Sequence, residues 1–273
     1  MPIVRPPAVA GLFYPARPDE LSAQVTSLLE EARQGLEEAT PTDQGPVKAL
    51  VAPHAGYIYS GPTAAVGYTS LDGDYDQVVL LGPCHHVGTP KVALPGADFF
   101  RTPLGDVPVW GAGVAKTEIL REVIVSPDVH AREHSLEVHL PFIQTVLGAD
   151  VPVLPLAVGW SSPQAVAAVL DAVWGGPETL VVVSSDLSHY LPYSTARAVD
   201  QSTLAELLAL SPDLAGDQAC GAHPVNGLTE VARRRGLGPQ LLDYRNSGDT
   251  AGDHSAVVGY AAVSYRQEMH DAA

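Results

Sequence analysis

Short apolar runs that end abruptly in polar residues are the feature that most limits how this chain can fold. In VVVSSDLSHY, residues 181–190, three valines give way to a polar stretch that contains Asp186 and His189. The same change occurs in ALVAPHAGY around His54, and in VVLLGPCHH around His85 and His86. Strands that are apolar at nearly every position are typical of sheets covered by helices on both faces. The chain is therefore expected to bury these runs and to present their polar ends at the edge of a sheet.

Strand and helix candidates alternate along the chain from residue 48 onward. The strand candidates are KALVA, QVVLL, VPVLPLAV, TLVVVSS and AVVGYAAVSY. Apolar spacing predicts an amphipathic helix over PDELSAQVTSLLEEARQGL, and further helices near 111–123, 133–147, 163–174, 196–210 and 224–235. This alternation predicts an α/β fold with a central, mainly parallel or mixed sheet and helices on both faces.

Length and composition favour one compact domain over residues 1–273, with 46% hydrophobic residues to form its core. The polar segment 37–46 is interpreted as a surface connection, because it is too short for a domain boundary. With 31 acidic and 15 basic residues the formal charge is -16, which argues against nucleic acid or an anionic membrane as partner. We expect a soluble, cytoplasmic protein, since the chain shows neither a signal peptide nor an apolar run of about 18 residues.

His54, His85 and His189 each follow a predicted strand within a few residues. Ligands of open α/β sheets bind beyond the carboxyl ends of the strands, so parallel strands would bring these imidazoles and Asp186 to one rim. A single histidine in such a place is more often a hydrogen-bonded loop residue, but three in the same topological position favour a site. Nucleotide binding and serine hydrolysis lack support, because no GxxxxGK[ST], GxGxxG or GxSxG motif occurs.

The two cysteines, Cys84 and Cys220, fit a reducing compartment rather than a disulfide framework. Cys220 precedes a helix predicted near Pro224, whose dipole would favour a thiolate, a good ligand for soft or borderline metals. The alternative, a small buried hydrophobe, is slightly favoured by the local sequence alone. Cys84 could line the same site, pair with Cys220 or pack, and packing is preferred.

His134 and Glu137 lie three residues apart on the helix predicted over 133–147, a spacing that suits ligation or a hydrogen-bonded pair. A structural or supporting role is preferred for both. His86, His223 and Asp249 are further candidates for positions around the site. Asp249 lies in a Gly/Asp/Ser loop that either borders the site or forms a solvated turn.

Seven motifs in order carry a resemblance to a known family. They are RPPAVAGLFYP, APHAGYIYSG, LGPCHH, EHSLEVHLPF, SSDLSHY, CGAHPV and YRNSGD. Together they resemble the Memo family, also known in bacteria and archaea as AmmeMemoRadiSam system protein B. The resemblance implies a fold similar to that of LigB-type class III extradiol dioxygenases, which are non-haem iron enzymes. It further implies a metal site formed by His54, His85 and Cys220, with Asp186 and His189 in the same pocket.

The function implied is that of a metalloprotein with a redox-active iron or copper, and as an enzyme it would be a metal-dependent oxidoreductase. His189 is expected to act as acid or base, with Asp186 orienting it or a bound water. A thiolate in place of a carboxylate departs from the dioxygenases, so catechol cleavage is expected to be absent or very slow. Two alternatives stay open: an active extradiol-type dioxygenase, and a vestigial site that binds a small molecule, a peptide or a protein. Radical-SAM and AMMECR-type proteins are the expected partners.

Overall fold

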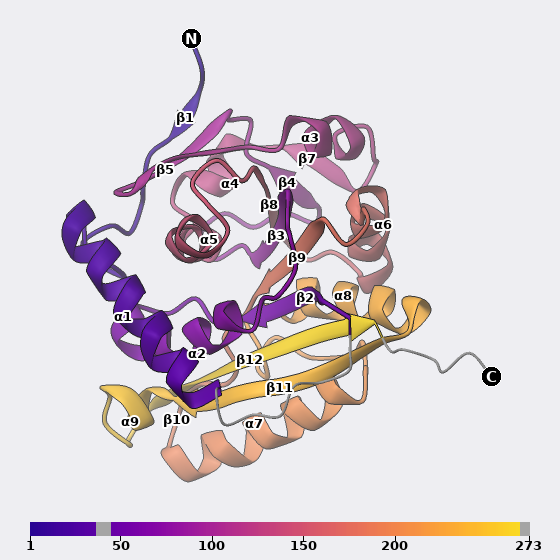
Figure 1. Ribbon diagram of the computed structural model, residues 1–273. Helices are drawn as coiled ribbons and strands as arrows, with labels where there is room; N and C mark the ends of the chain where they lie inside the picture. Colours follow the sequence, from indigo (N-terminus) through magenta and orange to yellow (C-terminus); the bar gives the residue numbers. More distant parts are fainter. Residues whose placement is uncertain (37–44, 268–273) are drawn as a thin grey trace.

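A mixed nine-stranded sheet forms the centre of the molecule in the computed structural model, which describes residues 1–36 and 45–267 (Figure 1). Its strands are β2 (Val47–Ala52), β3 (Gln77–Pro83), β4 (Val92–Leu94), β7 (Val123–Val125), β8 (Val153–Val158), β9 (Thr179–Ser184), β10 (His189–Leu191), β11 (Leu237–Asn246) and β12 (Val257–Gln267). Their order is β10-β12-β2-β9-β3-β8-β4-β7, and β11 pairs with β12. The middle strands β2, β9, β3 and β8 are parallel, whereas β12 and β4 run antiparallel to them. The predicted α/β class and mixed sheet are confirmed.

Helices cover both faces of this sheet (Figure 1). They are α1 (Pro18–Leu36), α2 (Tyr57–Thr69), α3 (Gly111–Thr117), α4 (Pro127–Ala131), the 3-10 turn η1 (Glu137–His139), α5 (Leu140–Val146), α6 (Pro163–Val173), α7 (Tyr193–Leu208), α8 (Ala222–Arg235) and α9 (Ser247–Thr250). None of the helices within the described ranges is long and apolar enough to cross a membrane.

Successive residues of the central strands enter two different cores, because side chains alternate across a strand. On β9, Val181 and Val183 pack with α6 and α8, while Leu180 and Val182 pack with α1, α2 and α5. All four side chains are fully buried, and each such burial contributes roughly 1.5–3 kcal/mol. The continuous apolar run is therefore explained by a strand with no solvent-facing side.

The prediction of a helix over 133–147 is wrong for residues 133–136. Residues 133–136 form a loop, and helical structure begins only at η1 and α5. The cause is local, because the Glu133 carboxylate accepts hydrogen bonds from the backbone of His134 and Ser135 (3.0 and 2.9 Å) and holds them in a turn. The helix predicted near 111–123 ends early, at Thr117. Of the predicted connection 37–46, residues 37–44 lie outside the described residues.

The chain start is attached to this loop through a small separate sheet and a buried ion pair. Strand β1 (Val4–Arg5) joins β5 (Phe99–Thr102) and β6 (Gly105–Pro108). The Arg5 guanidinium pairs with the fully buried Glu137 carboxylate. Glu137 also accepts hydrogen bonds from the backbone N–H of Ala8 (2.7 Å) and Val9 (3.0 Å) and from the Tyr14 hydroxyl (2.5 Å). Residues 5–14 are thereby fixed against the loop that contains His134.

Replacing Glu137 by Ala is expected to lower the free energy of unfolding by about 3–5 kcal/mol, because it leaves the buried Arg5 without a counter-charge. Urea denaturation of both proteins measures the difference. Arg17→Ala is the matched control, since it breaks an ion pair with Asp19 in which both side chains are about two-thirds exposed, and such pairs contribute about 0–1 kcal/mol. Equal small losses in the two variants would contradict the anchoring role of Glu137.

Candidate metal centre

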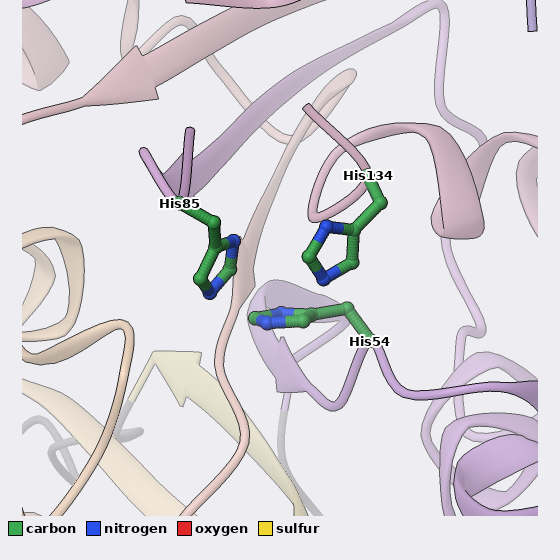
Figure 2. A group of neighbouring side chains, drawn as sticks. All are labelled: His54, His85 and His134. Carbon is green, nitrogen blue, oxygen red and sulfur yellow. The ribbon is translucent and has the colours of Figure 1, made fainter. Parts of the chain in front are cut away.

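Three imidazoles meet where the central strands end (Figure 2). His54 lies two residues after β2 and His85 two residues after β3, as predicted from the strand pattern. The third, His134, comes from the loop before η1, and its ring centroid lies 4.5 Å from that of His85 and 5.5 Å from that of His54. One potential ligand nitrogen of each ring lies within 4.8 Å of the other two. This group can hold a metal ion.

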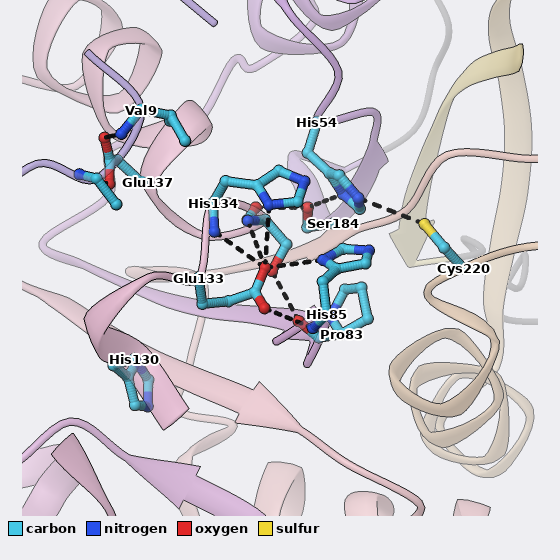
Figure 3. Close-up of polar contacts among 12 residues, drawn as sticks. Val9, His54, Pro83, His85, His130, Glu133, His134, Glu137, Ser184 and Cys220 are labelled. Carbon is cyan, nitrogen blue, oxygen red and sulfur yellow. Dashed lines mark hydrogen bonds and ion pairs between the residues drawn. The ribbon is translucent and has the colours of Figure 1, made fainter. Parts of the chain in front are cut away.

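Ser184, the last residue of β9, fixes the protonation of the His54 ring (Figure 3). Its single hydroxyl hydrogen is donated to the Ser135 carbonyl at 2.6 Å, since a carbonyl can only accept. His54 Nδ1 at 2.6 Å and His139 Nε2 at 2.9 Å must therefore donate to the same hydroxyl oxygen. His139 Nδ1 then accepts from the Tyr68 hydroxyl at 3.0 Å. In this tautomer His54 Nε2 keeps its lone pair for a metal.

Glu133 determines which ring nitrogen of His85 carries the hydrogen, through the contacts drawn in Figure 3. Burial alone would raise the pKa of Glu133, but hydrogen bonds from the His85 ring and from the backbone of His85 and Ser135 lower it to about 2. The ionised carboxylate can only accept, so His85 Nδ1, at 2.8 Å, carries a hydrogen and its Nε2 is free. A carboxylate that orients a ligating histidine in this way is common in metal sites.

Burial also keeps two of the rings neutral. It lowers the pKa of His54 well below the ordinary value, helped by the neighbouring histidines, and it lowers that of His134 to about 4. A metal binds neutral imidazole, so these two donors are already in the binding state at neutral pH.

Cys220 lies behind His54, outside the group of three rings. Its Sγ is 3.3 Å from His54 Nε2 and 3.3 Å from the backbone nitrogen of Asp186, which donates to it. Burial and the nearby Asp186 raise the pKa of the thiol, so the thiolate expected from the dipole of α8 does not form without a metal. Both Cys84 and Cys220 are free, and the half-buried Cys84 packs against the hydrophobic core.

A cleft of about 810 Å³ opens above the three histidines and is also lined by Asp186 and His189. Asp186 Oδ1 accepts a hydrogen bond from the His54 backbone nitrogen at 2.8 Å, and burial raises the pKa of this carboxyl to about 7. Burial lowers the pKa of His189, which starts β10 at the side of the cleft. The rim predicted from the strand ends therefore exists, with both residues on it.

The other predicted residues have different positions. His86 is exposed, with its ring centroid 6.1 Å from that of His134. Glu137 pairs with Arg5 and fixes the start of the chain. His223 Nδ1 donates to the Ser161 carbonyl at 3.0 Å. Asp249 caps α9, where it accepts from the Asn246 backbone nitrogen (2.9 Å). Neither His223 nor Asp249 is among the described residues that line the cleft.

The sequence matches the family described as "Memo-like protein" over residues 5–264. The chain belongs to the Memo family. MEMO1 family proteins from Methanopyrus kandleri and Aquifex aeolicus are each 36% identical to it, over 96% of this chain and 99% of theirs. The MEMO1 family protein from Desulfurococcus amylolyticus is 34% identical over 96% of this chain and 98% of its own. The resemblance drawn from the seven motifs is confirmed.

Sequence reasoning missed Glu133, Ser184 and His139 as parts of this Memo-family site. Glu133 directly precedes His134 in EHSLEVHLPF, and Ser184 directly follows the valines of β9. Glu133 therefore stood beside a residue that was singled out, and Ser184 and His139 stood two residues from Asp186 and Glu137. Their roles depend on contacts 45–49 residues away in sequence, which neither helical nor strand periodicity reports.

Replacing Ser184 by Ala is expected to destabilise the protein by about 2–4 kcal/mol, because two ring N–H groups and one carbonyl lose their partner inside the core. Urea denaturation measures this loss, and ring ¹⁵N chemical shifts report whether the hydrogen leaves His54 Nδ1. Ser264→Ala is the control, since that buried strand hydroxyl has no hydrogen-bond partner among the described residues. If the two variants lose equal stability and the His54 tautomer is unchanged, Ser184 does not fix the ring.

Proposed function

We propose that this protein is a metalloprotein that binds a redox-active ion, iron or copper, through His54 and His85. The observation that carries the proposal is the convergence of three imidazoles, two of which have their Nδ1 hydrogens committed to buried acceptors. Such preorganisation is expected of a ligand set, because the donor atoms need not reorganise when the ion binds.

The third ligand is either His134 or Cys220. His134 is supported by geometry, since its ring already belongs to the group. Cys220 is supported by the family motifs and by its contact with His54 Nε2. Imidazole suits iron, copper and zinc alike, whereas a thiolate favours the softer ions, so the third ligand bears on which metal is preferred.

A bound redox ion would supply electron transfer to or from a molecule in the cleft. Within the chain, His189 lies on the cleft wall as a base that burial keeps neutral at pH 7. Asp186 holds the His54 backbone in place through its Oδ1. We infer an oxidoreductase role from this combination, in the cytoplasm, where a reducing environment keeps Cys220 as a thiol. Radical-SAM and AMMECR-type proteins are its proposed partners.

Metal analysis of protein purified without oxygen tests the proposal. The wild type is expected to carry close to one equivalent of iron or copper, and His54→Ala is expected to lose it, because His54 belongs to both candidate ligand sets. His223→Ala is the matched control, since within residues 1–36 and 45–267 that ring donates only to the Ser161 carbonyl and does not line the cleft. Wild-type metal content in a folded His54→Ala variant would overturn the proposal.

The pH dependence of iron(II) affinity identifies the third ligand. The pKa of the Cys220 thiol is raised, so at any pH from 6 to 8 the thiol is protonated and must lose its proton to bind. Affinity would then rise about tenfold per pH unit. With His134 instead, whose pKa is already lowered to about 4, affinity would vary much less over this range. Because the pKa values of His54 and His134 are both lowered, protons are expected to compete with the metal for these two rings only at lower pH than for ordinary histidines.

Comparing Cys220→Ser with His134→Ala completes this measurement. If Cys220 is the ligand, Cys220→Ser flattens the pH dependence and His134→Ala leaves it steep. A flat wild-type profile, with binding lost only in His134→Ala, would exclude the cysteine.

A further inference from the structure

The outer walls of the cleft are aromatic. They include Phe13 from the segment before α1, Tyr59 from α2 and Tyr190 from β10, and the buried Tyr260 from β12 also lines the cleft. Tyr190 is 76% exposed and Leu12, beside Phe13, is 80% exposed. A volume of about 810 Å³ is in the range of clefts that bind small molecules. A cleft of this size with several aromatic side chains in its lining suits a flat apolar group that enters from outside.

Tyr190 is held in an unusual conformation at this mouth. Its φ of +57° is in the left-handed region, which costs a residue other than glycine roughly 1–3 kcal/mol. The pairing of β10 with β12 shifts register at the same point, between His189 and Leu191. Since the ring is mostly exposed, its burial does not offset the strain. Bulges and strained residues of this kind occur beside functional sites, where they direct a side chain.

The charge on the walls has one sign. Among the described residues that line the cleft none is Lys or Arg, whereas the exposed Asp253 is present. Asp186 also lines the cleft, but it is buried and its pKa is raised to about 7, so the fixed negative charge is that of Asp253. Asp253 is exposed and accepts hydrogen bonds from the Ser255 backbone and hydroxyl (2.7 and 2.5 Å), which favour its ionised form. The whole chain carries a formal charge of -16. An anion that reached the outer cleft would lose water without meeting a fixed positive side chain.

We propose that the cleft takes an aromatic ligand whose outer end is neutral or cationic, with aromatic amines preferred over aromatic acids. This deepens the proposed function, on which it rests only for what a metal would do to the bound ligand, whereas binding in the cleft rests on the walls. The preference itself comes from the walls. Tyrosine faces attract an ammonium group, and Asp253 adds a carboxylate at the same opening.

Phenethylamine and phenylacetate are suitable probes because they have similar size and opposite charge. We expect ligand-observed NMR with the metal-free protein, at about 0.15 M salt to screen distant charges, to show phenethylamine binding at least tenfold more tightly. Asp253→Lys should reduce or reverse this ratio. Asp150→Lys makes the same charge change at an exposed position that does not line the cleft, and should leave the ratio unchanged.

Tyr190→Asn tests the aromatic wall, since asparagine tolerates the left-handed conformation and the variant should fold. Weaker phenethylamine binding in this variant supports the proposal. Equal binding of the two probes, tighter binding of phenylacetate, or binding of neither overturns it. Failure of the proposed function would be seen separately as absence of metal from the purified protein, and these measurements without metal do not depend on that result.

Discussion

The buried carboxylate of Glu133 is the group on which the geometry of the site depends. It accepts hydrogen bonds from the ring and backbone of His85 and from the backbone of His134, and so positions two of the three imidazoles. Through the same turn it places the Ser135 carbonyl, which orients Ser184 and thereby the His54 ring. A carboxylate buried this deeply is stable only when its oxygens are fully hydrogen-bonded. His85 supplies two of the donors, and the backbone of His134 and Ser135 supplies the other two.

The strand pattern predicted the part of the site that lies on neighbouring parallel strands. His54 and His85 follow β2 and β3, and Asp186 follows β9, which lies between them in the sheet. The continuous apolar runs and the rule that ligands bind beyond strand ends were sufficient for this, because each run and the polar residues after it can be recognised in the local sequence. The parts of the site that the sequence did not predict are those whose conformation is decided by contacts with residues distant in the sequence.

His134 and α2 are the two opposite cases: a helix was predicted at His134 and does not form, whereas α2 forms where no helix was predicted. Leu136, Leu140 and Ile143 have helical spacing, yet the residues before them form a turn because Glu133 binds their backbone. The stretch YIYSGPTAAVGYT, with its glycines and internal proline, has low helix propensity, yet it forms α2. There tertiary packing decides the outcome: a Cβ on Gly61 would lie only 2.9 Å from Leu28 on α1, so the glycine allows the two helices to pack closely.

His54 follows its strand as the local sequence predicts, and contacts with residues distant in the sequence fix its ring. Its backbone nitrogen donates to Asp186, its Nδ1 to Ser184, and its Nε2 faces the Cys220 thiol. The partners of its ring and backbone N–H thus come from β9 and from the loops after β9 and before α8. Because these contacts restrain the His54 ring, the ring cannot rotate when an ion binds. The ion must therefore accept the position that His54 Nε2 already has. The remaining freedom of the site is in its third ligand: His134 is neutral and ready, whereas Cys220 holds a proton that only a cation could displace. The identity of the bound ion therefore depends on whether its attraction for sulfur exceeds the free energy of removing that proton in a buried site.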